Sequence, residues 1–216
     1  MLIAGSSPSL AATFFPEGFV TQLLSFVLDA WKSLARPKPG EVEERITGRL
    51  FEHMVDEYPR RGLPLTIMPE TPLYDAKTGI AYGRTDFRFL HREIPSQRVY
   101  LTVETKRLNI PQPSGSVKGN LKAYVGPEGM ERFISGKYSS GLPEAAMLAY
   151  VMDGKITVAA GKISKLCAVW ATQLSAVSKP VFGLHPVLAP PHGLSEHARS
   201  TAHGGPIKLH HLFVAA

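Results

Sequence analysis

Two neighbouring segments near the middle of the chain alternate apolar and polar side chains with the period of a β-strand. The first reads RTDFRFL, residues 84–90, and the second reads RVYLTVETK, residues 98–106. Successive side chains of a strand point to opposite faces, so each segment has its own set of residues on either face. The short connection HREIPSQ between them is compatible with antiparallel pairing. We therefore expect two adjacent antiparallel strands, and this pair constrains the fold more than any other feature.

Apolar periodicity elsewhere predicts helices before and after these strands. Residues 18–35 and 41–58 have helical spacing and are separated by the helix-breaking sequence RPKPG, and residues 156–177 form a third helical pattern. The remaining segments are predicted as strands at 63–68 and 207–214, a strand followed by a turn at 144–155, a turn-rich stretch at 69–79, a loop at 110–120 and a short helix near 127–136. This order predicts an α/β protein with a central mixed β-sheet flanked by helices.

The chain length of 216 residues suits one domain with a sizeable core. We expect residues 1–40 to form an irregular N-terminal arm and a helix. Residues 41–216 are expected to form the α/β domain, with both parts making one compact unit.

Composition narrows the class of protein further. Cys167 is the single cysteine, so an intrachain disulfide and a cysteine zinc cluster are both excluded. The N-terminus lacks the positive region of a signal peptide, and no segment has the ~20 apolar residues of a membrane span. These features predict a soluble, cytoplasmic protein without a membrane partner. The net charge of +6 is compatible with a polyanionic partner such as nucleic acid, but does not require one.

Ionisable residues lie on the two central strands at positions that would bring them together. Glu104 and Lys106 share one face of the second strand, and Asp86 lies in the first strand. Antiparallel pairing would place two carboxylates and an ammonium group at one point. Carboxylate oxygens suit a hard divalent cation such as Mg²⁺, which polarises phosphoryl oxygens, while a nearby lysine can act on the attacking water.

A simpler interpretation is that these groups form ordinary ion pairs on a solvated sheet face. Asp86 would then pair with an arginine of its own strand, and Glu104 with Lys106 or Arg107. The spacing alone does not distinguish this interpretation from a catalytic site.

The combination of motifs resembles the PD-(D/E)XK nuclease family, which has the restriction-endonuclease-like fold. The resemblance is carried by GRTDF, by VETKRL after a short gap, and by the preceding acidic helix EVEERITGRL. It implies a Mg²⁺-dependent (or Mn²⁺-dependent) nuclease in which Asp86 and Glu104 bind the metal and Lys106 acts on the attacking water. The Thr105 carbonyl would be a further metal ligand. The sequence departs from the Pro-Asp motif in the name of the family, because Thr85 rather than proline precedes Asp86.

The same resemblance implies a supporting acid on the preceding helix. Glu43 lies on the stripe shared by Ile46, Leu50 and Met54 and should face the sheet, whereas Glu44 falls at the edge of that stripe. We favour Glu43 and keep Glu44 as the alternative.

Cations, aromatic donors and histidines in the second half of the chain could contact phosphates. Each could equally belong to a solvated surface or to the core, and the histidine could satisfy a backbone carbonyl. The candidates for nucleic-acid binding are Lys122, Tyr124, Arg132, Lys137, Tyr138, His197 and Arg199. Six of the eight histidines lie from His185 onward, but their spacing matches no established zinc pattern.

The expected function is therefore metal-dependent hydrolysis of nucleic-acid phosphodiester bonds, with DNA as the expected substrate. One alternative is a non-catalytic nucleic-acid-binding module of a larger assembly, such as a phage-defence system. Another is a structural or interaction protein whose acids are only ion-paired. A homodimer or a larger complex is compatible with each of them.

Overall fold

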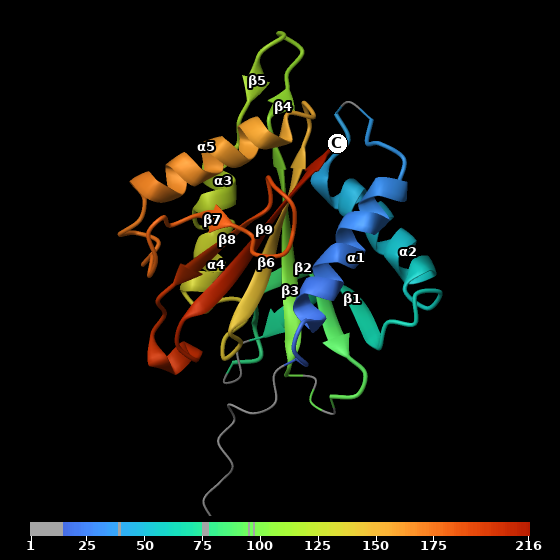
Figure 1. The fold of residues 1–216 in the computed structure, drawn as a ribbon, viewed down its shortest axis with the longest axis vertical. Coiled ribbons are helices and arrows are strands. Elements are labelled where there is room, and N and C mark those ends of the chain that lie inside the picture. Colours follow the sequence, from blue (N-terminus) through green and yellow to red (C-terminus); the bar gives the residue numbers. More distant parts are fainter. Residues whose placement is uncertain (1–14, 39, 75–77, 95, 97) are drawn as a thin grey trace, which may run out of the picture.

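The computed structural model describes residues 15–38, 40–74, 78–94, 96 and 98–216. Its centre is a seven-stranded mixed sheet with the strand order β1-β2-β3-β6-β9-β8-β7 (Figure 1). The strands of this sheet are β1 (Leu65–Tyr74), β2 (Ala81–His91), β3 (Tyr100–Leu108), β6 (Glu144–Val151), β7 (Gly183–Leu184), β8 (Gly193–His197) and β9 (Ile207–Ala215). Strands β3, β6 and β9 are parallel, while β1-β2-β3 and β9-β8-β7 are antiparallel. The predicted α/β class with a central mixed sheet is confirmed.

Helices cover both faces of the sheet, with one buried core beneath each group. In Figure 1, α1 (Phe19–Ser33) and α2 (Glu43–Glu57) lie on one side of the sheet, opposite α5 (Ile156–Val169). The short helices α3 (Leu121–Val125) and α4 (Met130–Ile134) belong to the same core as α5. The remaining elements are the small hairpin of β4 (Ile110–Pro111) and β5 (Val117–Lys118), and the 3₁₀ turn η2 (Thr201–His203).

The first helix is part of the main core. Trp31 of α1 stacks on Tyr150 of β6 with ring centroids 5.0 Å apart, and its indole N–H donates to the carbonyl of Ala215. These contacts join α1 to the middle of the sheet. Residues 1–14 of the expected N-terminal arm lie outside the described residues.

Two predicted boundaries are wrong. The stretch 69–74 was predicted to be turn-rich, but β1 continues through it and pairs with β2, as in Thr71 opposite Thr85. Its prolines are tolerated because β1 is the edge strand and has a partner on one side only. The helix predicted over 156–177 ends at Val169, and turns follow it.

Among the described residues, no helix has both the length and the apolar character that a membrane crossing requires.

Candidate functional site

The candidate site lies where β2 and β3 stop pairing with each other. Their backbone register ends at Phe87 opposite Val103, although both strands continue beyond it. Past this point the backbone N–H of Thr105 donates to Oδ2 of Asp86 at 2.6 Å. The Asp86 carboxylate thus occupies the opening between the strands, while the other edge of β3 remains paired with β6.

Glu104 and Lys106 form a buried ion pair beside this opening. Lys106 Nζ lies 2.8 Å from Oε1 of Glu104, and their exposed fractions are 8% and 1%. Arg132 of α4 donates from Nη1 to the same Oε1, also at 2.8 Å. Oε2 of Glu104 is buried and has no hydrogen-bond partner among the described residues. The pair therefore exists, but it is not on the solvated sheet face that the simpler interpretation assumed.

Asp86 does not form the ion pairs with neighbouring arginines that the simpler interpretation allowed. Arg84 pairs with Glu70, with Nη1 and Oε2 3.0 Å apart, and the guanidinium of Arg88 lies 4.4 Å from the ring centroid of Tyr100.

Helix α2 contributes Glu43 to the same group. One oxygen of Glu43 accepts the backbone N–H of Arg107 at 2.7 Å, and the other lies 3.5 Å from Lys106 Nζ. Glu43 faces the sheet, as expected from its place on the apolar stripe of the helix. Glu44 is exposed at the edge of the cavity.

These groups surround one cavity of about 410 Å³. Its inner wall includes the four predicted catalytic residues, and charged residues from β1, β2 and α4 extend the lining outward. The lining residues are Glu43, Glu44, Thr47, Glu70, Gly83, Arg84, Asp86, Glu104, Lys106, Arg132, Lys137 and Tyr138. The structure thus gathers the predicted acids and the lysine in one place.

Burial and crowding of carboxylates change the protonation of this cluster. Burial and the neighbouring Asp86 carboxylate raise the pKa of Glu104 to about 7, despite Lys106 and Arg132. Burial also raises the pKa of Glu43. Burial alone would lower the pKa of Lys106, but the carboxylates of Glu104 and Glu43 outweigh it, so that pKa is raised. At neutral pH the lysine is a cation, and Glu104 is partly protonated.

The free energy of unfolding is expected to fall as pH rises from about 5 to about 7 through the titration of Glu104. An unfolded glutamate loses its proton near 4.5, whereas folded Glu104 keeps it to about 7. The folded state therefore binds more protons in this interval, and rising pH favours unfolding. Urea denaturation of wild type and Glu104→Gln across this range isolates the effect. The stability of wild type relative to the variant should decline with pH, and a constant difference would contradict the prediction.

The structure places the predicted nucleic-acid contacts in different surroundings. Arg132 and Lys137 line the cavity, and Lys122 is exposed on α3 outside it. Tyr138 also lines it, and its hydroxyl donates to the carbonyl of Arg84 at 2.7 Å.

Two of those predictions, Tyr124 and His197, are wrong because these residues are fully buried, whereas Arg199 is half-buried and its guanidinium is bonded to the backbone. Tyr124 is fully buried, with its hydroxyl 3.0 Å from Nδ1 of His211. His197 is fully buried between Ser195 and the carbonyl of Leu174. Arg199 donates to three backbone carbonyls, which are those of Ser139, Leu142 and Gly205.

Sequence reasoning missed two features of the cavity. It did not identify Glu70 as a lining residue, and it did not connect Arg132 with Glu104. No short-range pattern marks either of them. Glu70 follows a proline in the stretch predicted as turns, and Arg132 meets Glu104 only through the packing of α4.

The histidine pair near the end of the chain lacks the lone pairs that zinc would need. Nδ1 of His185 accepts the backbone N–H groups of Val187 and Leu188, so its proton is on Nε2. His185 then donates to Nδ1 of His210 at 3.0 Å, and Nε2 of His210 carries a proton. In this arrangement each ring carries its proton on Nε2, and the lone pair of its Nδ1 already accepts a hydrogen bond.

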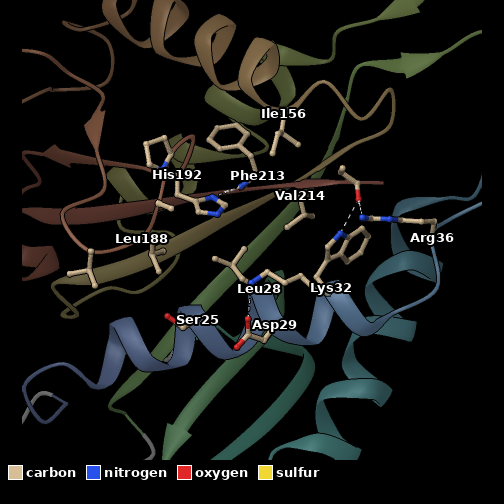
Figure 2. Close-up of a pocket in the computed structure, with 15 residues that line it drawn as sticks. Ser25, Leu28, Asp29, Lys32, Arg36, Ile156, Leu188, His192, Phe213 and Val214 are labelled. Atoms are coloured by element: carbon tan, nitrogen blue, oxygen red, sulfur yellow. Dashed lines mark hydrogen bonds and ion pairs between the residues drawn. The ribbon is translucent and has the colours of Figure 1, made fainter.

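A second hollow, of about 430 Å³, lies between α1 and the segment that precedes β8 (Figure 2). Its walls are largely apolar and include Leu28, Leu188 and Val214. Lys32 pairs with Asp29 at 2.9 Å on its helical side. None of the predicted catalytic residues lines it.

The cavity of Asp86 and Glu104 offers carboxylate oxygens, a donor type that Mg²⁺ accepts. Among the described residues, no group of three or more His, Cys, Asp or Glu is arranged to hold a metal ion. Mg²⁺ commonly uses only one or two carboxylates and keeps several waters. Asp86 and Glu104 supply such oxygens, and the unpartnered Oε2 of Glu104 is the kind of buried atom that a cation would satisfy. The Thr105 carbonyl, the third predicted ligand, accepts a hydrogen bond from Lys106 Nζ at 2.9 Å.

Comparisons of the chain with protein-family models, curated proteins and solved structures found no match.

Proposed function

We propose that this chain is a Mg²⁺-dependent (or Mn²⁺-dependent) nuclease of restriction-endonuclease-like fold, with DNA as the expected substrate. The observation that supports it best is the buried Glu104–Lys106 pair beside Asp86, in which one oxygen of Glu104 has no hydrogen-bond partner among the described residues. A purely structural ion pair would be expected to have its buried oxygens satisfied.

Charge balance in the inner cavity supports a divalent cation. The carboxylates of Glu43, Asp86 and Glu104 outnumber the cations of Lys106 and Arg132. The raised pKa of Glu104 is a consequence of burial within this acid-rich group. Asp86, Glu104 and the Thr105 carbonyl would hold the metal, which when bound supplies Lewis acidity at a phosphoryl oxygen and a more acidic water.

Lys106 is suited to donate hydrogen bonds to reacting groups. Its ammonium is fixed by Glu104, by the Thr105 carbonyl and by the nearby Glu43. Its raised pKa, caused by the carboxylates of Glu104 and Glu43, makes it a cation at neutral pH. It would orient the attacking water and stabilise negative charge that develops on the phosphate. Glu43, anchored by the Arg107 N–H, holds the lysine from the helix side.

Cations at the mouth of the cavity would contact the nucleic-acid backbone. Lys137 is exposed there, and Arg84 lies nearby in its pair with Glu70. Such contacts are insensitive to base sequence and weaken with salt. Lys122 remains a candidate for a more distant phosphate.

The test is incubation of the purified protein with plasmid, single-stranded DNA and RNA, with Mg²⁺, with Mn²⁺ and with EDTA. We expect metal-dependent cleavage of at least one substrate. Failure to cleave any of them, together with no binding of Mn²⁺ by calorimetry, would reject the proposal.

A non-catalytic nucleic-acid-binding module within a larger assembly is the alternative function. Oε1 of Glu104 already accepts hydrogen bonds from two cations, Lys106 and Arg132, and this observation favours the alternative function. In that case nucleic acid should bind without being cut, and added metal should change neither binding nor melting temperature.

A further inference from the structure

A single residue fixes the position of the Asp86 carboxylate. Oδ2 of Asp86 accepts the backbone N–H of Thr105 at 2.6 Å and the Thr105 hydroxyl at 2.9 Å. Among the described residues, none donates a hydrogen bond to the other oxygen, Oδ1. Asp86 lines the cavity, so Oδ1 is the oxygen that is left for a ligand.

The hydroxyl of Thr105 is itself oriented by a chain of buried hydroxyl groups. Thr105 has one hydroxyl proton and gives it to Asp86, so the 3.0 Å bond between Thr105 and Thr47 must have Thr47 as its donor. By the same reasoning, the Tyr150 hydroxyl donates to Thr47 at 3.3 Å. The protons therefore point in one direction, from Tyr150 through Thr47 and Thr105 to Asp86.

All members of this hydroxyl chain are buried. Tyr150 and Thr105 are fully buried, and Thr47 is 6% exposed. Burial raises the pKa of Tyr150, which keeps its hydroxyl protonated as a donor. The Tyr150 ring stacks on Trp31. The hydroxyl chain thus links β6, α2 and β3 to the Asp86 carboxylate on β2.

We infer that Thr105 is a positioning residue that sets the orientation of Asp86 toward a divalent cation, with Thr47 and Tyr150 as its supports. The inference rests on the proposed function and adds a role for the Thr105 side chain, which is separate from its carbonyl. A carboxylate with one oxygen held by two donors has little freedom to rotate. Its second oxygen is then presented to a ligand in a fixed direction.

Substitutions at Thr105 test this directly, with Mn²⁺ as the probe and calorimetry as the readout. Thr105→Val removes the hydroxyl but keeps the shape, and it is expected to weaken Mn²⁺ affinity about 10-fold or more. Thr105→Ser should restore affinity to near the wild-type value. Tyr150→Phe, which removes only the first donor of the chain, should give a smaller loss in the same direction.

Thr102→Val is the matched control. Thr102 is also a fully buried threonine of β3, but its hydroxyl bonds to Ser139 and not to Asp86. It should lose stability without losing Mn²⁺ affinity. Equal affinity of wild type, Thr105→Val and Tyr150→Phe would overturn the inference and leave the proposed function intact. Failure of Thr105→Ser to restore affinity would also overturn it. Absence of Mn²⁺ binding by the wild type would reject both.

Discussion

Replacing Lys106 with alanine is expected to lower the rate of metal-dependent cleavage about 10²–10⁴-fold, the usual contribution of a positioned proton-transfer or charge-stabilising group. The reason is the position of its ammonium, 2.8 Å from Glu104 and 2.9 Å from the Thr105 carbonyl, inside the cavity that Asp86 lines. Single-turnover cleavage assays at saturating Mg²⁺ measure the chemical step and separate it from substrate binding.

Lys137→Ala is the control for Lys106→Ala. Lys137 lines the same cavity but is exposed, so its loss should raise KM and lower the sensitivity of substrate binding to salt while leaving the single-turnover rate nearly unchanged. Retained nucleic-acid binding by Lys106→Ala would show that the variant is folded. If both lysine variants cleave as fast as the wild type, the assigned role of Lys106 is wrong.

Replacing Glu104 with glutamine is expected to weaken Mn²⁺ affinity about 100-fold or more, and to reduce cleavage by at least as much. Even the loss of a group that only supports a metal ligand typically lowers metal affinity about 10–100-fold, and Glu104 is proposed as a direct ligand. The fold should survive, because at pH 7 the amide replaces a carboxyl whose pKa is about 7 and which is therefore partly protonated. Calorimetry with Mn²⁺ and thermal melting with and without metal measure the two effects.

Glu70→Gln is the matched control for Glu104→Gln. Glu70 is an acid of the same cavity, but its side chain is 52% exposed and pairs with Arg84. An exposed ion pair contributes little, so affinity and stability should both stay close to wild type. Equal losses in the two variants would indicate a general effect of negative charge around the cavity, and the assignment of Glu104 as a ligand would fail.

Much of the architecture follows from local sequence patterns. The alternation in residues 84–90 and 98–106 predicted the antiparallel pair β2 and β3, and the periodicity of residues 41–58 predicted α2 with Glu43 toward the sheet. These predictions succeed because side-chain period and backbone geometry are properties of a few consecutive residues.

The failures concern residues whose surroundings come from distant parts of the chain. Tyr124 and His197 carry groups that could contact a phosphate, but the packing of β8, β9 and α3 buries both. The turn-forming residues of 69–74 gave no sign that β2 would pair with them. Burial and pairing depend on which elements become neighbours, and local periodicity carries no such information.

The sequence by itself determined the mixed α/β pattern, the two central strands and the acids and lysine on them. Only the tertiary structure decided that β2 and β3 separate at Asp86, that Glu104 and Lys106 are buried, and that Arg132 and Glu43 reach the same pair. The physical reason is that alternation fixes the face of a strand from which a side chain emerges. The solvent, charges and hydrogen-bond donors that it meets there are set by elements tens of residues away.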